Sequence, residues 1–95
     1  MIMMSTPPHP FPAGQILMTP AAQEALLPDE VLKALRRHLS GDWGDCSSDD
    51  AAVNDEALRH GARVFSVYHT VQGTTFWIIT EADRSITTVL LPEDY

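Results

Sequence analysis

The last third of the sequence alternates apolar and polar residues and is rich in β-branched and aromatic side chains. Residues 63–71, 74–80 and 85–91 each read as a β-strand, with turn signals at 72–73 and 82–84. Connections this short join neighbouring antiparallel strands, so the pattern predicts a three-stranded meander. The positions that we expect to be buried are Phe65, Val67, Val71, Trp77, Ile79, Val89 and Leu91. Apolar residues occupy both faces of these strands, so one face is expected to meet helices and the other an N-terminal arm or a second subunit.

The clearest helix signal lies over residues 28–39. Apolar residues at positions 31, 32, 35 and 39 recur with helical spacing and form one stripe. Pro28 and the two acids after it suit a first turn, and Gly41 suits a helix end. The pattern therefore predicts an amphipathic helix that packs on the sheet.

Weaker patterns flank this helix. A second helix is expected after a cap at Ser47 or Ser48, with a stop at Gly61 after His60, but its apolar stripe is thin. Residues 15–19 read as an edge strand or an irregular segment, followed by a short helix over 20–26. We expect an α+β fold, with two or three short helices on one face of a three- to four-stranded antiparallel β-sheet.

The chain has 95 residues, which is the size of one small domain. Residues 1–13 contain four prolines, at positions 7, 8, 10 and 12, so we expect a disordered arm followed by a single domain over 14–95. This arm has no basic and apolar segments of a signal peptide, and no apolar run is long enough for a membrane span. With a single cysteine, Cys46, these features predict a cytoplasmic protein with no membrane association.

The excess of acidic residues is the feature of the composition that says most about possible partners. The chain has 13 Asp and Glu against 6 Lys and Arg, a net charge of −7, so we expect no direct nucleic-acid binding. Six acids fall between positions 42 and 56 without a Lys or Arg among them. They predict either a solvated face that also caps the following helix or an acidic surface that binds a basic protein partner, and we take the second as the hypothesis. The residues assigned to this surface are Asp42, Trp43, Asp45, Asp49, Asp50, Asp55 and Glu56. Trp43 is expected either to pin its loop to the core or to anchor the interface.

Catalytic motifs are absent from the sequence. It has no nucleophile elbow, no phosphate-binding glycine loop and no EF-hand spacing, so we expect no metal and no cofactor. An alternative site combines Arg63, Tyr68, His69 and Arg84, which could act on a phosphodiester by acid–base and electrostatic catalysis. The excess of acids argues against this nuclease hypothesis, because a polyanionic substrate would be repelled.

Three segments carry a family resemblance. Residues 38–45 read HLSGDWGD, residues 77–85 read WIITEADRS and residues 90–95 read LLPEDY. Over about residues 16–95 the chain resembles a family of short proteins encoded in bacterial genomes, plasmids and phages. This resemblance implies a mobile-element setting and carries over no catalytic residue. The predicted element order is also similar in architecture to RelE/ParE-like toxins, which are usually basic.

Three functions remain open on this basis. The first is an interaction protein of a mobile genetic element that inhibits a host defence complex, in the manner of an anti-CRISPR or anti-restriction protein. The second is a RelE/ParE-like toxin ribonuclease. The third is a non-catalytic regulatory module that forms a homodimer through a sheet edge or the second sheet face. The small size, the acidic surface and the lack of a catalytic motif favour the first.

Overall fold

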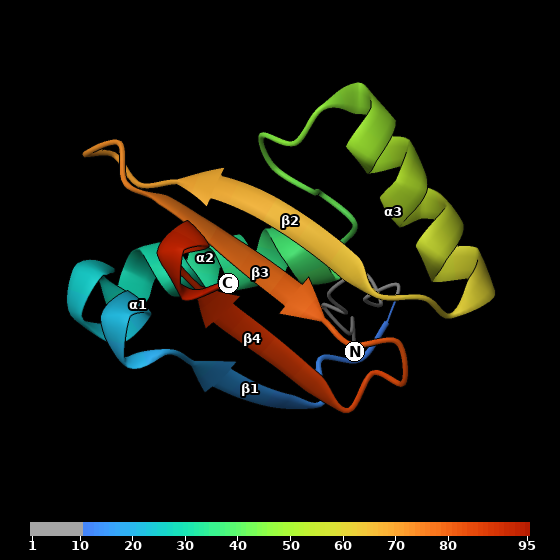
Figure 1. The fold of residues 1–95 in the computed structure, drawn as a ribbon, viewed down its shortest axis with the longest axis horizontal. Coiled ribbons are helices and arrows are strands. Elements are labelled where there is room, and N and C mark those ends of the chain that lie inside the picture. Colours follow the sequence, from blue (N-terminus) through green and yellow to red (C-terminus); the bar gives the residue numbers. More distant parts are fainter. Residues whose placement is uncertain (1–10) are drawn as a thin grey trace, which may run out of the picture.

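Four strands and three α-helices make up the fold in the computed structural model, which describes residues 11–95 (Figure 1). In chain order they are β1 (Gln15–Met18), α1 (Pro20–Ala25), α2 (Pro28–Leu39), α3 (Ser48–His60), β2 (Val64–His69), β3 (Thr75–Thr80), β4 (Ile86–Leu90) and a 3₁₀ turn (Pro92–Asp94). The α+β prediction is confirmed. Among the described residues, no helix combines the length and apolar character needed to cross a membrane.

The sheet has the order β1-β4-β3-β2. β2–β3 and β3–β4 are antiparallel, which confirms the meander, but β1 pairs with β4 in parallel, with Ile16 opposite Thr87. The expectation of a wholly antiparallel sheet is therefore wrong at this pair. The reason is the connection, because β1 and β4 are separated by the helices and two further strands rather than by a tight turn.

Helices α1 and α2 cover one face of the sheet, and α2 crosses behind the strands in Figure 1. Pro28 occupies the first turn of α2, and Val31, Ala34 and Leu35 turn inward onto the sheet. The buried sheet positions facing them include Tyr68, Phe76, Ile78 and Val89. No α-helix covers the other face in the described part of the chain, but the 3₁₀ turn Pro92–Asp94 lies over β3 there, and Tyr95 meets Trp77 edge-on (Figure 1).

Strand β2 buries the opposite set of side chains from the one expected. Val64, Ser66 and Tyr68 are buried, whereas Phe65 and Val67 are only half-buried. Among the other expected positions, Ile79, Val89 and Leu91 are buried, Trp77 is half-buried and Val71 is 92 % exposed. The prediction of Val71 is wrong because the strand ends at His69. The β2 prediction is wrong because both alternating sets are apolar enough to be a core face.

The outer edge of β2 is occupied by groups from α3 and from the loop before it. The Asn54 amide donates to the Phe65 carbonyl at 2.7 Å and accepts from the Phe65 N–H at 3.0 Å. The Val67 N–H donates to the Trp43 carbonyl at 3.1 Å, and the Asp45 N–H donates to the Val67 carbonyl at 2.7 Å. These bonds replace a neighbouring strand and fix α3 beside the sheet.

The N-terminal segment joins the core earlier than expected. Residues 1–10 of the predicted arm lie outside the described residues. Phe11 is buried, stacks on Trp43 with ring centroids 6.2 Å apart and meets His38 edge-on at 5.4 Å. The packed chain therefore begins before the expected boundary at residue 14. Four prolines indicate an irregular backbone, but they do not prevent an aromatic residue among them from packing.

Candidate functional site

Asp42 begins the acidic loop and is held by two groups of its own neighbourhood. The Arg37 Nε donates to Asp42 Oδ2 at 2.8 Å, and the Gly44 N–H donates to Asp42 Oδ1 at 3.1 Å. The hydrogen bond from Arg37, and then that from Gly44, hold the pKa of Asp42 below its ordinary value. Gly44 has φ +76°, and a side chain there would overlap the Val67 carbonyl oxygen. The loop therefore has one defined conformation against β2.

Trp43 lies at the centre of this loop and is only 5 % exposed. Its indole N–H donates to Asp55 Oδ1 of α3 at 3.0 Å, and its ring stacks on Phe11. Burial of so large a ring stabilises the loop and the helix against the core. Of the two roles expected for Trp43, the structure supports packing of its loop onto the core rather than an exposed anchor for an interface.

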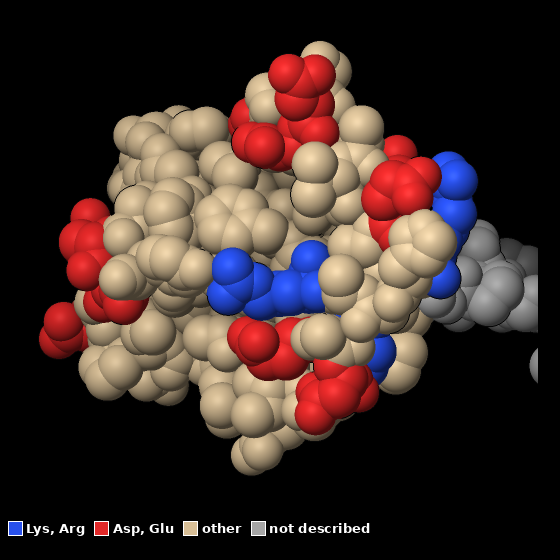
Figure 2. All heavy atoms as spheres, turned by 45° about the vertical axis from the view of Figure 1, so that its right-hand side comes forward, with Lys and Arg blue, Asp and Glu red and all other residues tan. Residues whose placement is uncertain are grey.

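The remaining acidic residues differ in whether their carboxylates bond to other side chains of the protein. Asp45 accepts from His69 Nδ1 at 2.7 Å, and Glu56 lies beside Arg59 at 3.3 Å and His60 at 3.1 Å on α3. Figure 2 shows acidic groups in separate clusters around a short line of basic groups, so the acidic surface is interrupted. Asp49 and Asp50 form the first turn of α3, where the helix dipole stabilises negative charge.

Helix α3 presents its outer face between these acids. Asn54 and Ala57 are buried and turn toward the sheet. Asp49, Val53 and Glu56 fall at helical spacing on the opposite side, and Val53 is 65 % exposed. The outer face thus combines carboxylates with one apolar side chain and, beside Glu56, the exposed Arg59 and His60, which is a combination suited to contact with another protein.

The four residues of the alternative nuclease site are not brought together. The Tyr68 hydroxyl is directed inward and donates to the Asp42 carbonyl at 2.6 Å, and burial raises the pKa of Tyr68. Arg63 donates to the Tyr95 hydroxyl at 3.0 Å, and Arg84 donates to backbone carbonyls, the nearest being that of Ala62 at 2.7 Å. His69 ends β2, whereas Arg63 precedes its first residue, a separation of roughly 17–20 Å for a strand of this length. No shared catalytic centre results.

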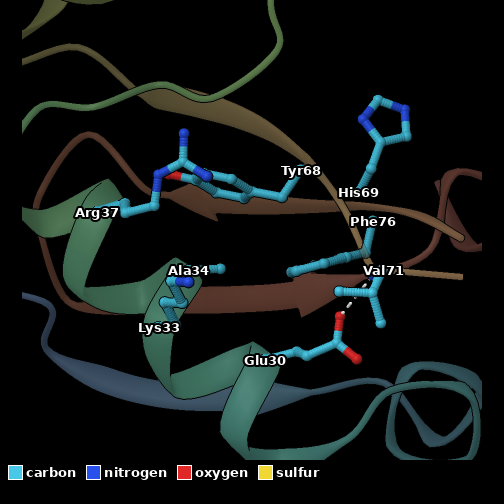
Figure 3. Close-up of a pocket in the computed structure, with 8 residues that line it drawn as sticks. All are labelled: Glu30, Lys33, Ala34, Arg37, Tyr68, His69, Val71 and Phe76. Atoms are coloured by element: carbon cyan, nitrogen blue, oxygen red, sulfur yellow. Dashed lines mark hydrogen bonds between the residues drawn. The ribbon is translucent and has the colours of Figure 1, made fainter. Parts of the chain in front are cut away.

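A small pocket of about 150 Å³ lies between α2 and the β2–β3 hairpin (Figure 3). The rings of Tyr68 and Phe76 form its wall, and Lys33 and Arg37 approach from α2. Its cationic character is reduced, because Arg37 is already paired with Asp42. Pockets for drug-sized ligands are typically about 300–1,000 Å³, so this one fits at most a group of side-chain size.

A buried chain of hydrogen bonds runs through the core, and no pattern in the sequence predicted it. His38 of α2 is fully buried, with Nδ1 2.5 Å from the Ser66 Oγ and Nε2 2.8 Å from the Thr80 Oγ1. The Thr80 Oγ1 lies 2.7 Å from the Thr87 Oγ1, and the Thr87 hydroxyl donates to the Ala13 carbonyl at 2.7 Å. One network therefore joins α2, three strands and the N-terminal segment.

The direction of each bond in this chain follows from the last one. Thr87 gives its single hydroxyl proton to Ala13, so Thr80 must donate to Thr87 and accept from His38. The proton of His38 is thus on Nε2, and Nδ1 accepts from the Ser66 hydroxyl. Burial, and then the charge of Arg84, lower the pKa of His38 to about 4, so the imidazole is neutral at pH 7.

Cys46 is not activated as a nucleophile. Burial, and then the charge of Asp50, raise the pKa of its thiol, which keeps the thiol protonated. In the described part of the chain, no three His, Cys, Asp or Glu side chains converge on a point that could hold a metal ion. Candidate surfaces for function include the outer face of α3, the small pocket and the uncovered parts of the sheet.

Comparison with known proteins identifies no relative. No protein-family model, no curated protein and no solved structure matches the chain. The resemblance to short mobile-element proteins and the architectural similarity to RelE/ParE-like toxins therefore stay predictions.

Proposed function

We propose that this protein acts by binding another protein, and that it presents the outer face of α3 to a basic surface of its partner. The observation that carries the proposal is the way α3 is fixed: Asn54 and Ala57 turn inward, and Asp49, Val53 and Glu56 are left outward. Carboxylates around an exposed apolar residue give both steering and a contact that excludes water.

The partner that fits this face is a cationic groove that normally holds nucleic acid. A net charge of −7 on a small domain favours association with such a groove and opposes binding of the nucleic acid itself. The proposed role is therefore inhibition of a nucleic-acid-handling defence complex of the host cell, in the cytoplasm, by a protein of a mobile genetic element. Trp43 is buried beneath this surface, and the exposed carboxylates of Asp42, Asp45 and Asp55 are bonded to Arg37, His69 and Trp43, so we assign them a secondary part in the contact.

The test is capture of partners from host lysate at low and high salt, followed by affinity measurement with the purified partner. The variant Asp49→Asn/Glu56→Gln removes two charges from the outer face of α3. Its control, Glu24→Gln/Asp29→Asn, removes two charges from α1 and α2, and Asp29 occupies the same helical turn in α2 as Asp49 does in α3.

We expect the α3 variant to weaken binding by roughly tenfold, which corresponds to about 1.4 kcal/mol. The control variant is expected to bind as the wild type does, and added salt is expected to weaken binding of the wild type. Equal affinities for the two variants, or binding that does not respond to salt, would refute the assignment of this face.

A further inference from the structure

The two edges of the sheet are treated differently. At β2 the outward backbone groups of Phe65 and Val67 are bonded by Asn54 and by the loop before α3. At β1, no strand or side chain among residues 11–95 is bonded to the outer edge, and β1 forms the lower border of the sheet in Figure 1. An uncovered edge of this kind is a template for a further strand.

The backbone groups at this free edge can be identified individually. The Gln15 N–H donates to the Ser85 carbonyl at 2.9 Å, and the Thr19 N–H donates to the Val89 carbonyl at 3.1 Å. Alternate residues of a strand bond to the same neighbour, so the odd-numbered residues of β1 face β4. The N–H and C=O groups of Ile16 and Met18 therefore point away from the sheet.

We propose that a second copy of this chain pairs with this edge, as two antiparallel β1 strands related by a two-fold axis at Leu17. In this register Ile16 lies opposite the partner's Met18, and each of these pairs exchanges both backbone hydrogen bonds. The spacing of two residues makes the edge complementary to itself, as an isologous interface requires. Leu17 then faces the partner's Leu17 across the axis.

The surrounding surface is apolar where this pairing would cover it. Four large apolar side chains, Ile16, Leu17, Leu27 and Leu32, are between 40 % and 61 % exposed. A groove of about 260 Å³ has Met18, Leu26 and Leu32 among its lining residues, and Leu17 faces the opposite side of the sheet from Met18. Ile16 and Met18 share the helix side of β1, because they pair with the buried Thr87 and Val89. The partner's Ile16 therefore meets Met18 at the mouth of this groove.

Charge also favours a second copy at this position. The molecule has a net charge of −7, so two copies repel each other over most of their surface. β1 has the sequence QILM and carries no charged residue, which allows two copies to approach there. One short strand and one groove lie at the small end of interface sizes, below about 1,200 Å² in total, so we expect dissociation in the micromolar range.

Disulfide trapping tests the register directly. In a Cys46→Ser background, Leu17→Cys places two thiols opposite each other at a non-hydrogen-bonded antiparallel pair, where Cα atoms lie about 4.5 Å apart and a disulfide can close. The control is Val71→Cys, which is 92 % exposed but lies beyond β2. We expect Leu17→Cys to form covalent dimers at least tenfold faster than Val71→Cys. Equal rates would overturn the proposal.

Sedimentation of the full chain tests the dimer without any thiol. We expect the weight-average mass of the wild type to rise from monomer toward dimer between about 1 µM and 1 mM. The variant Leu17→Lys, which places like charges on the axis, is expected to stay monomeric with unchanged circular dichroism. A wild type that is monomeric throughout leaves the edge to a strand of a different protein and overturns the proposal. A dimer unaffected by Leu17→Lys overturns it as well.

The inference is independent of the proposed function. β1 and α3 lie at opposite edges of the sheet, so pairing through β1 leaves the outer face of α3 exposed in both copies (Figure 1). Leu17→Lys removes the dimer without touching Asp49 or Glu56, and Asp49→Asn/Glu56→Gln does the reverse. The two proposals can therefore fail separately.

Discussion

Acidification should destabilise the protein through His38. The imidazole is fully buried, neutral and bonded at both nitrogens, and its pKa falls from an ordinary value of 6.5 to about 4. The imidazole of His38 therefore becomes protonated near pH 6.5 in the unfolded chain but only near pH 4 in the folded chain. The contribution of neutral His38 to the free energy of unfolding is fully present above pH 6.5 and is lost as the pH falls toward 4.

The size of this effect follows from the width of the pH window. Each pH unit between the two pKa values costs 1.36 kcal/mol for one proton, so the full loss is about 3 kcal/mol. Most of it is already present at pH 5, where we expect the free energy of unfolding to be about 2 kcal/mol lower than at pH 8. For a small domain this is a large part of the total stability.

Urea denaturation at intervals between pH 8 and pH 5 measures this loss, with two sets of variants as controls. His38→Gln keeps one acceptor and one donor but cannot be protonated in this range, so its unfolding free energy should change much less with pH. His60→Gln/His69→Gln replaces two exposed histidines by the same residue and is the matched control for the substitution itself. A wild type whose stability is constant from pH 8 to 5, or an unchanged dependence in His38→Gln, would refute the reasoning.

Three further changes test the packing around the site, each by urea or thermal denaturation. Asn54→Leu leaves two backbone groups on the β2 edge without partners and should cost about 2 kcal/mol; no loss would mean that the amide is dispensable there. Gly44→Ala should cost more than about 2 kcal/mol, because its side chain overlaps a β2 carbonyl at φ +76°, whereas Gly73→Ala meets no atom and should cost less. Phe11→Ala should cost about 3 kcal/mol, and an unchanged melting temperature would contradict its burial.

Local signals account for the parts of the fold that the sequence predicted. The stripe of α2 and its proline, the cap and glycine end of α3, and the short turns of the meander are each encoded within about a dozen residues. Physical effects at that range act before any tertiary contact, so they can be read from the chain.

Tertiary contacts explain what could not be predicted. Ser66 is buried because it bonds to His38, which lies 28 positions earlier, and no periodicity marks a serine for burial on that ground. The direction of β1 likewise depends on pairing with Thr87, which becomes a neighbour only when the sheet is complete.

The candidate surface was predicted only as a stretch of sequence. Six acids between positions 42 and 56 look equivalent in composition. In the structure, the carboxylate of Asp42 pairs with Arg37, that of Asp45 pairs with His69, and that of Asp55 accepts a hydrogen bond from the Trp43 indole. These partners lie on other elements or in a loop turn, so which carboxylates remain available to a partner is decided by the fold and not by the charge pattern.

The pairing of β1 with β4 also imposes an order on folding. The strands of the meander, β2 to β4, are joined by short turns and can associate early, since closing a short loop costs little chain entropy. The bond from Thr87 to Ala13 spans 74 positions. On the ribosome, the segment from Phe11 to Met18 has no strand to join until Ile86–Leu90 has emerged. An N-terminal segment made first is therefore the last to dock, and its docking completes the hydrogen-bond chain of His38.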